Sequence, residues 1–330
     1  MKKSRIFCAI LASVAFFALL FSGTMAFAAK KDKAQTNAGK IKIVATIFPE
    51  YDWVLQILGK QAKNAEVTLL LDNGVDLHSF QPSARDIIKV NSADIFIYVG
   101  GESDEWVEDA LKNSTNKNQR TVNLLEVIGD GAKVEELVEG MEAEDEDDEE
   151  DEELDEHVWL SVKNAKILCA AIADSLCEVD SKNAAEYKKN LVDYTKKLDS
   201  LDEKFAREIS KSDKKTVLFG DRFPFRYLTD DYDLKYYAAF VGCSAETEAS
   251  FKTIIFLANK LDELNLGSVC TIEKSDRKIA SSIIQNSKNK KRSILEIDSM
   301  QATTMRDAKK GATYISIMEK NLEALKKALK

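Results

Sequence analysis

Apolar residues recur along most of the chain at two spacings, one typical of strands and one typical of helices. In the first part these patterns alternate, with predicted strands at 41–48, 67–71 and 94–99 and predicted helices at 51–58, 83–90 and 104–111. After residue 214 the alternation resumes, with predicted strands at 216–219, 236–241, 269–272 and 293–297 and predicted helices at 224–231, 246–264, 276–286 and 307–329. Strands that alternate with helices indicate an α/β fold with mostly parallel sheets covered on both faces.

A long helical region separates the two alternating parts. Apolar residues keep helical spacing over 164–177 and again over 183–211, where Lys and Asp occupy the other side. A helix of about 28 residues is roughly 40 Å long, which is enough to pass from one domain to another. The sequence therefore predicts an α/β fold of two lobes joined by a long rigid helix. The predicted segments are an N-terminal lobe over 41–162, a helical connector over 163–213 and a C-terminal lobe over 214–330.

The first 28 residues have a different pattern. Three basic residues precede an apolar run over 6–21, and Ala26-Phe27-Ala28 follows before Ala29, as in a secretory signal with a small-residue cleavage site. We expect residues 1–28 to be this signal, residues 29–40 to be a disordered leader, and the protein to be secreted across the cytoplasmic membrane. Cys8 lies inside the apolar run rather than after it, so we expect no lipobox cysteine.

Charge is concentrated in one block. The chain carries a net charge of −9, and thirteen acidic residues fall within 142–156, so the remainder of the exported chain is nearly neutral. A block of like charges cannot bury apolar area, and it predicts a mobile loop. The sequence pI of 5.1 argues against a nucleic-acid-binding protein, which needs a basic surface for phosphate contacts.

The sequence outside the predicted signal contains four cysteines, Cys169, Cys177, Cys243 and Cys270, and no CxxC pair. A chain of this length has enough core to fold without disulfides, so we expect buried thiols. The one disulfide to test is Cys243 with Cys270.

Histidine occurs at only two positions, His78 and His157, each with an acidic residue one or two positions before it. His78 follows a predicted parallel strand, which is where open α/β sheets bind ligands. Asp221, Glu273 and Asp298 each follow a predicted strand of the second lobe. If the lobes face each other, two imidazoles and two carboxylates form a shell suited to Zn²⁺, Mn²⁺ or Fe²⁺. The alternative for each aspartate is a helix N-cap, and for each histidine a side chain without a functional role.

Several segments in combination resemble the metal-specific solute-binding proteins of ABC importers, the zinc and manganese binders called cluster A-I. These are 76–82 (DLHSFQP), 93–94 before a strand, 101–102 with Trp106 soon after, 155–160 (DEHVWL) and 241–248 (VGCSAETE). The likeness runs in order from about residue 41 to residue 329. It implies two α/β lobes joined by a rigid helix, one metal ion in the cleft between them, and delivery of that ion to a membrane permease.

The resemblance also implies ligands. It matches His78 and His157 to the first two ligands of the family and Asp298 to the aspartate that supplies the last. At the third position the family has His or Glu, and here Gly220 stands there, which has no ligating side chain. We expect Asp221 to take its place.

Two further expectations attach to this third position. If Asp221 is not the third ligand, we expect Glu273 or a water molecule to be that ligand. Arg222 is a cation beside a cation site, so we expect it to hold a carboxylate that lies next to the ligands. Replacing Cys243 is expected to leave metal affinity unchanged.

The acidic block occupies the place where zinc-binding members carry a histidine-rich loop. It is either a weak cation antenna that raises the local metal concentration or a solubilising insertion. Its position favours zinc over manganese as the transported ion. The implied partners are the ABC permease and the metal ion, with no nucleic acid, and we expect a monomer that is not an enzyme.

An extracytoplasmic metal-dependent hydrolase is the alternative function, because three protein ligands and a water form a hydrolytic site. The sequence contains no HExxH or GxSxG motif to support it. Another alternative is a cleft for an organic solute lined by aromatic rings. We expect those rings to belong to the core instead; they are Trp106, Trp159, Phe223, Phe225 and Tyr227.

Overall fold

The computed structural model of the chain describes residues 39–142, 153–244 and 248–330. The predicted signal, most of the predicted leader and residues 143–152 of the acidic block lie outside the described residues. Residues Lys40–Lys330 form one compact unit by their contacts. In the described parts of the chain, no helix has the length and apolar character needed to cross a membrane.

The N-terminal half is built on a sheet of four parallel strands in the order β2-β1-β3-β4. The strands are β1 (Ile41–Ala45), β2 (Ala65–Leu69), β3 (Ile95–Tyr98) and β4 (Arg120–Asn123). Its helices are α1 (Phe48–Leu58), α2 (Ala84–Asn91), α3 (Trp106–Lys112) and α4 (Leu124–Ile128). Because the strands are parallel, their carboxyl ends lie at one edge of the sheet. The strand that follows β1 lies on one side of it, and β3 lies on the other side, so the strand order reverses at β1. Such a switch point is where doubly wound sheets bind ligands.

The C-terminal half contains two parallel strand pairs that a single bridge between Phe219 and Cys270 connects. The strands are β5 (Thr216–Leu218), β6 (Lys235–Tyr237), β7 (Ser268–Thr271) and β8 (Ser293–Glu296). The helices are α7 (Arg226–Asp231), α8 (Phe251–Glu263), α9 (Lys278–Asn286), α10 (Met305–Lys309) and α11 (Tyr314–Ala328). All four strands were predicted, and the α/β class with parallel sheets is confirmed.

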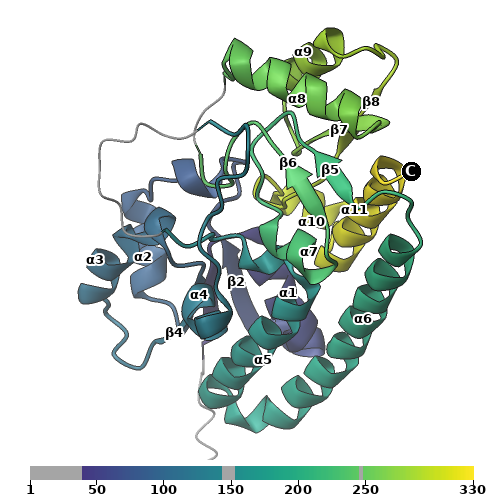
Figure 1. Cartoon of the computed structure of the whole chain (residues 1–330). Coiled ribbons are helices and arrows are strands. Elements are labelled where there is room, and N and C mark those ends of the chain that lie inside the picture. The colour runs from purple at the N-terminus through teal and green to yellow at the C-terminus, as the bar shows by residue number, and fades with distance from the viewer. Residues whose placement is uncertain (1–38, 143–152, 245–247) are drawn as a thin grey trace, which may run out of the picture. The chain divides into compact units, whose positions relative to one another are not determined.

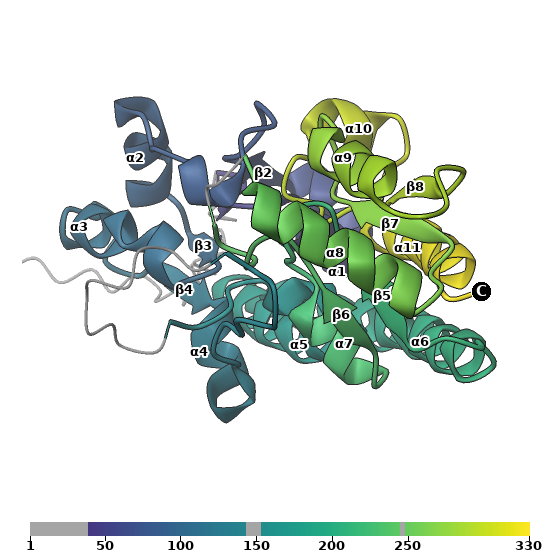
Figure 2. The same cartoon turned by 45° about the horizontal axis from the view of Figure 1, so that its top comes forward.

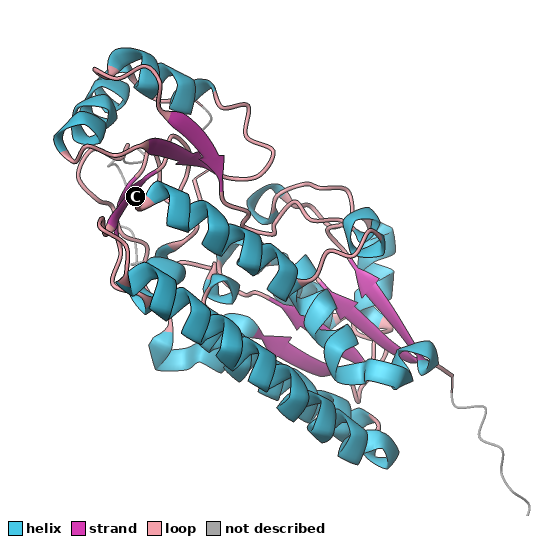
Figure 3. Ribbon diagram, turned by 90° about the vertical axis from the view of Figure 1, so that its right-hand side faces the viewer, coloured by secondary structure: helices cyan, strands magenta, loops and turns pink. Residues whose placement is uncertain are grey.

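Two long helices link the halves. They are α5 (Val162–Val179) and α6 (Ala184–Ser210), which has 27 residues. Helix α6 packs against α1 and α5 and also against α11 near the C-terminus, so it touches both halves. Figure 3 shows it running alongside both groups of strands. The predicted long helix is confirmed, while the predicted lobe boundaries stay predictions.

The core follows from the layering of helices and strands. Figures 1 and 2 show α2 and α3 on the opposite side of the N-terminal sheet from α5 and α6. The main core joins this sheet to α1, α5, α6 and α11, and it includes Trp53, Trp159 and Tyr314. A second core lies between β5 to β7 and the helices α8 and α9. Short 3-10 turns complete the described elements, at Gly59–Asn64, Leu77–Ser79, Glu102–Asp104, Gly129–Gly131, Val158–Leu160 and Ser181–Asn183.

The sequence pattern was wrong at two places. It missed β4 and α4, whose segments are short and carry little periodicity. It also predicted one closing helix, whereas the chain forms α10 and α11. Gly311 between them has φ +97°, which a helix interior does not allow, and the Thr313 side chain then accepts the Ser316 N–H to begin α11.

Candidate metal centre

His78 lies in the loop that follows β2, on the 3-10 turn Leu77–Ser79. The Asp76 carboxylate begins this turn by accepting the His78 backbone N–H at 3.1 Å. The ring nitrogen Nδ1 lies 2.8 Å from the hydroxyl of Ser103, which stands on the loop after β3. With Nδ1 held in this contact, Nε2 faces the ring of His157.

His157 is fixed in the same manner by a different neighbour. One oxygen of Asp155 accepts the His157 backbone N–H and also lies 2.9 Å from its ring nitrogen Nδ1. The His157 ring is fully buried and packs beside Trp159, with ring centroids 5.2 Å apart. A carboxylate on Nδ1 fixes the tautomer and orientation of a ligating histidine.

The end of the acidic block is therefore ordered and buried, contrary to the predicted mobile loop. Asp155 and Glu156 are each only 2% exposed. Before them, Leu154 forms an antiparallel bridge with Val134. The prediction is wrong here because the last two acids of the block have partners in the folded protein. His157 pairs with Asp155, and the Ser103 backbone N–H donates to Glu156. The predicted loop at 143–152 lies outside the described residues.

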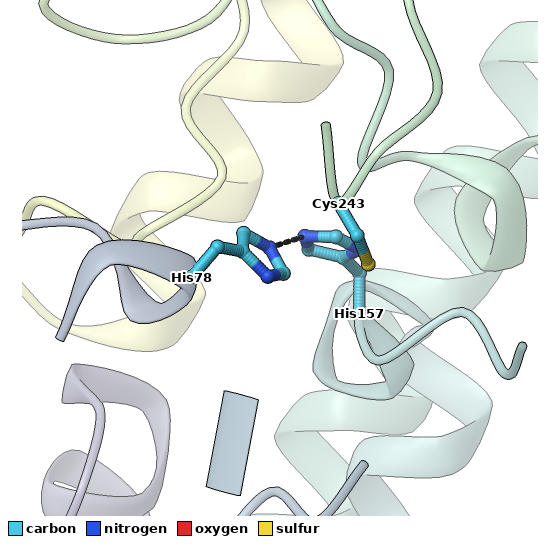
Figure 4. Close-up of side chains that lie close together, drawn as sticks. All are labelled: His78, His157 and Cys243. Carbon is cyan, nitrogen blue, oxygen red and sulfur yellow. Dashed lines mark hydrogen bonds between the residues drawn. The ribbon is translucent and has the colours of Figure 1, made fainter. Parts of the chain in front are cut away.

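The two histidines meet at the edge of the N-terminal sheet. Their Nε2 atoms are 3.1 Å apart and their ring centroids 5.1 Å apart. Figure 4 shows the two rings pointing toward each other from separate segments. Two imidazoles with hydrogen-bonded Nδ1 atoms and converging Nε2 atoms form an arrangement that suits a transition metal ion.

A cysteine from the C-terminal half completes a group of three. Among the described residues, the ligand atoms of His78, His157 and Cys243 all lie within 4.8 Å of one another. Gly242 is pressed against the His157 ring, since a Cβ there would be 3.1 Å from its Cε1 and Nδ1. The Cys243 backbone N–H donates to Glu135 Oε1 at 2.9 Å.

The three side chains of this group differ in how burial and neighbouring charges shift their pKa values. Burial, His157 and Arg222 lower the pKa of His78 well below its ordinary value, so this ring is neutral and available to a metal. Burial also disfavours charge on His157, but Asp155 and the acids around it outweigh burial and raise its pKa. Burial, reinforced by Glu135 among other acids, raises the pKa of the Cys243 thiol well above its ordinary value.

Glu156 supports His78 from behind. Its Oε1 accepts the Ser103 backbone N–H at 2.9 Å, and its Oε2 lies 3.5 Å from His78 Nδ1. Burial raises the pKa of Glu156 to about 7 despite the Ser103 hydrogen bonds. Gly101 accommodates this carboxylate, because a Cβ at that glycine would be 2.5 Å from Oε1.

Asp76 connects the two halves beside the site. The guanidinium of Arg222, which follows β5, pairs with the Asp76 carboxylate, so the expectation that Arg222 holds a carboxylate is confirmed. The amide of Gln301 satisfies both neighbours when its nitrogen donates to Asp76 and its oxygen accepts from His157 Nε2 at 3.2 Å. Three loops of the C-terminal half thus reach the histidine pair, carrying Arg222, Cys243 and Gln301.

The predicted carboxylate ligands lie outside this group. Asp221 accepts the Arg222 backbone N–H at 3.1 Å and lines a hollow shared with Asp76. Burial raises the pKa of Asp221. Asp298 accepts the Met300 backbone N–H at 2.8 Å. Burial, followed by the nearby Glu273, raises its pKa to about 7. The roles of Asp221, Asp298 and the reserve Glu273 as ligands stay predictions.

The sequence interpretation missed Cys243 and Gln301 as neighbours of the site. A usable signal existed for the cysteine: an absent side chain at Gly220 calls for another donor, and Cys243 follows a predicted strand of the same lobe. The four described cysteines are free, so the Cys243 to Cys270 disulfide does not form. The predicted core placement of the aromatic rings is confirmed, with Trp106 only partly buried; the buried rings are Trp159, Phe223, Phe225 and Tyr227.

A comparison with models of known protein families identifies the family to which this chain belongs. The model of the family described as "Zinc-uptake complex component A periplasmic", ZnuA, matches residues 43–328. The chain belongs to this family. Membership in the ZnuA family confirms the resemblance to metal-specific solute-binding proteins and the two-part α/β fold.

Individual ZnuA relatives agree. The chain is 31% identical over 293 residues to the zinc-binding lipoprotein AdcA of Streptococcus pneumoniae, covering 87% of this chain and 56% of AdcA. It is 30% identical over 304 residues to the high-affinity zinc uptake system protein ZnuA of Bacillus subtilis, covering 91% of each. The crystal structure of the Zn(II)-bound ZnuA-like domain of S. pneumoniae AdcA superposes with a TM-score of 0.69 at 29% identity, covering 88% of this chain and 99% of that domain. This chain thus spans little more than half the length of AdcA.

Proposed function

We propose that this protein captures a zinc ion between the carboxyl edges of its two sheets and delivers it to an ABC permease for uptake. The observation that carries the proposal is the convergence of His78 and His157, whose Nε2 atoms lie 3.1 Å apart while Ser103 and Asp155 hold their Nδ1 atoms. The two relatives described above are named for zinc binding and zinc uptake.

The donor set supports a transition metal rather than calcium or magnesium, which prefer oxygen ligands alone. Imidazole nitrogen suits zinc well, and we propose zinc over manganese or iron as the cargo. His78 and His157 are the proposed ligands from the N-terminal half. Asp221 and Asp298 are the candidates for a carboxylate donor that the sequence offers, and one of them is enough to complete a four-ligand shell with the two histidines and one further donor.

The remaining roles follow from this one. A carrier for an importer works outside the cytoplasmic membrane, so we propose export by the signal at 1–28 and an extracytoplasmic location, at the cell surface or in a periplasm. The proposed partners are the permease and the metal ion, and a monomer is sufficient for both. Capture and release require no catalytic group.

The test is a metal count on the purified protein. We expect one zinc ion per chain after incubation with zinc and dialysis, and loss of that ion in the H78A/H157A double variant. Circular dichroism of both proteins controls for folding. A wild-type protein that retains no zinc would refute the proposal, and zinc-dependent cleavage of ester, phosphoester or peptide substrates would favour the hydrolase alternative.

A further inference from the structure

Gly220, the position that the sequence resemblance matches to the third ligand of the family, has no room for a side chain in this structure. A Cβ built on Gly220 would lie 2.5 Å from the Cα of Ala280 and 2.7 Å from its backbone nitrogen. Both atoms belong to the main chain of α9 rather than to a flexible side chain. No side chain of any kind fits at residue 220 while α9 keeps this place, so the third ligand has to come from elsewhere.

We propose that the sulfur of Cys243 is the third protein ligand of the captured ion, beside the Nε2 atoms of His78 and His157. This inference rests on the metal-capture function proposed above and adds a residue to it. It differs from the expectation drawn from the sequence, which placed Asp221 at this position and a buried thiol without a role at Cys243.

The geometry favours the cysteine over the aspartate. The three ligand atoms already lie within 4.8 Å of one another, and a tetrahedral zinc ion spaces its ligands by roughly 3.5 Å. The spacings of the three atoms are therefore at most roughly 1.3 Å longer than a bound zinc ion requires. Asp221 is not a member of this group, and one of its oxygens already accepts the Arg222 backbone N–H.

The local sequence keeps the thiol in place. Gly242 allows the chain to pass directly against the His157 ring, where any Cβ would be 3.1 Å from two ring atoms. The next residue is then beside the ring, and its backbone N–H is anchored on Glu135. On the other side, the Arg222 guanidinium donates to the Ser244 carbonyl oxygen at 3.4 Å, so the segment is held both before and after Cys243.

A thiolate ligand also has a chemical consequence. When the ion binds, the S–H bond breaks, a sulfur–metal bond forms and the proton passes to solvent. Thiolate sulfur is a soft donor that favours zinc and disfavours manganese, which prefers carboxylate and carbonyl oxygen. Cys243 therefore determines specificity within the proposed site.

X-ray absorption at the zinc edge of the loaded full-length protein tests this ligand directly. We expect one sulfur atom at about 2.3 Å from zinc in the wild type, together with lighter ligands at about 2.0–2.2 Å. The sulfur signal should vanish in C243S and persist in C177S, which removes a half-buried thiol on α5 as a matched control. One zinc ion bound by nitrogen and oxygen alone in the wild type would overturn this proposal and leave the proposed function standing.

Competition against a chromophoric chelator gives the second measurement. Removing a ligand should cost at least as much as the about 10–100-fold loss typical of residues that support a ligand, so we expect C243S to bind zinc at least about tenfold more weakly. The affinity of C243S for manganese should fall less than its affinity for zinc, so the ratio of zinc affinity to manganese affinity should be smaller in C243S than in the wild type. Equal zinc affinities for C243S and wild type would overturn the proposal, whereas failure of the wild type to bind zinc would instead refute the proposed function.

Discussion

Arg222 and Asp76 form an ion pair across the proposed metal site. Arg222 follows β5 in the C-terminal half, and Asp76 begins the turn that carries His78 in the N-terminal half. The arginine side chain is 15% exposed and the aspartate side chain 20%. A second arginine nitrogen donates to the Ser244 carbonyl oxygen at 3.4 Å, close to Cys243. Separation of the two sheet edges has to break this pair.

We expect the R222Q variant to release zinc faster than the wild type. The substitution removes the charge that ties the two halves together, and we expect roughly a tenfold faster release, which corresponds to about 1.4 kcal/mol. Stopped-flow mixing of loaded protein with a chelator measures the release. K89M is the matched control, because it removes an ion pair with Asp86 that lies within α2. Identical release from R222Q and wild type would contradict a tie across the site.

Asp155 is expected to contribute to affinity without touching the ion. Its carboxylate holds His157 by two hydrogen bonds of 2.9 Å, and loss of such a partner typically lowers metal affinity by about 10–100-fold. We therefore predict weaker zinc binding by D155A, measured by competition titration. D231N, which changes a carboxylate on α7, is the comparison variant. A D155A affinity equal to that of the wild type would show that the ring needs no such support.

Zinc affinity should fall as the pH is lowered. The pKa of His157 is raised above its ordinary value of 6.5, because the surrounding acids outweigh burial. Below that raised pKa the ring carries a proton that zinc must displace, so affinity falls more steeply on the acidic side of it than on the basic side, where only the Cys243 proton remains to be displaced. Titrations from about pH 8 to about pH 5 measure this dependence. A constant affinity over that interval would exclude His157 as a ligand.

The acidic segment at 143–152 is open to a direct test. Replacing its residues with Gly and Ser removes nine acidic side chains and keeps the length. We expect zinc affinity at high salt to stay the same, because the proposed ligands all lie outside the segment and salt screens its charges. A slower association at low salt would support the antenna interpretation, and an unchanged rate would support the solubilising insertion. A large loss of affinity at high salt would contradict the proposed ligand set.

Glu50 predicts a dependence of stability on pH. Burial, followed by repulsion from Asp104, raises the pKa of Glu50 to about 8. The folded state then holds a proton that the unfolded state has lost, so the free energy of unfolding decreases as the pH rises from about 4.5 to about 8. The carboxyls of Asp104 and Glu156, with pKa values of about 6 and about 7, act in the same direction.

The E50Q variant should therefore lose less stability than the wild type between pH 5 and pH 8. Glutamine has a shape similar to that of glutamate and cannot ionise, so the contribution of Glu50 to the pH dependence of the free energy of unfolding disappears. Urea denaturation at several pH values gives the free energies. E66Q changes an exposed residue of β2 and should retain the wild-type dependence. An E50Q slope as steep as that of the wild type would mean that Glu50 is not protonated in the folded state.

The alternation of strands and helices predicted most of the fold, because buried strands and amphipathic helices differ in apolar spacing. Helix α6 was predicted from the regular spacing of Leu198, Leu201 and Phe205, which are all buried on one side. The division between α10 and α11 was not predicted, because only one residue, Gly311, interrupts the apolar spacing of this segment.

The candidate site was only partly predictable. The two histidines were identified because histidine is rare in this chain and loops after parallel strands bring such residues to one edge. Cys243 was not identified. The absent side chain at Gly220 indicates only that another donor is needed, and nothing in a linear sequence shows which residue of the C-terminal half lies beside the two histidines. That depends on how loops far apart in the chain pack together, which no local pattern encodes.

The contact between Gly220 and α9 also limits what protein engineering can build at this site. A histidine placed at residue 220 would collide with the Ala280 backbone, because its Cβ would lie 2.5 Å from the Ala280 Cα. A zinc sensor or a stronger chelator made from this scaffold therefore has to be designed around His78, His157 and Cys243, and not around residue 220.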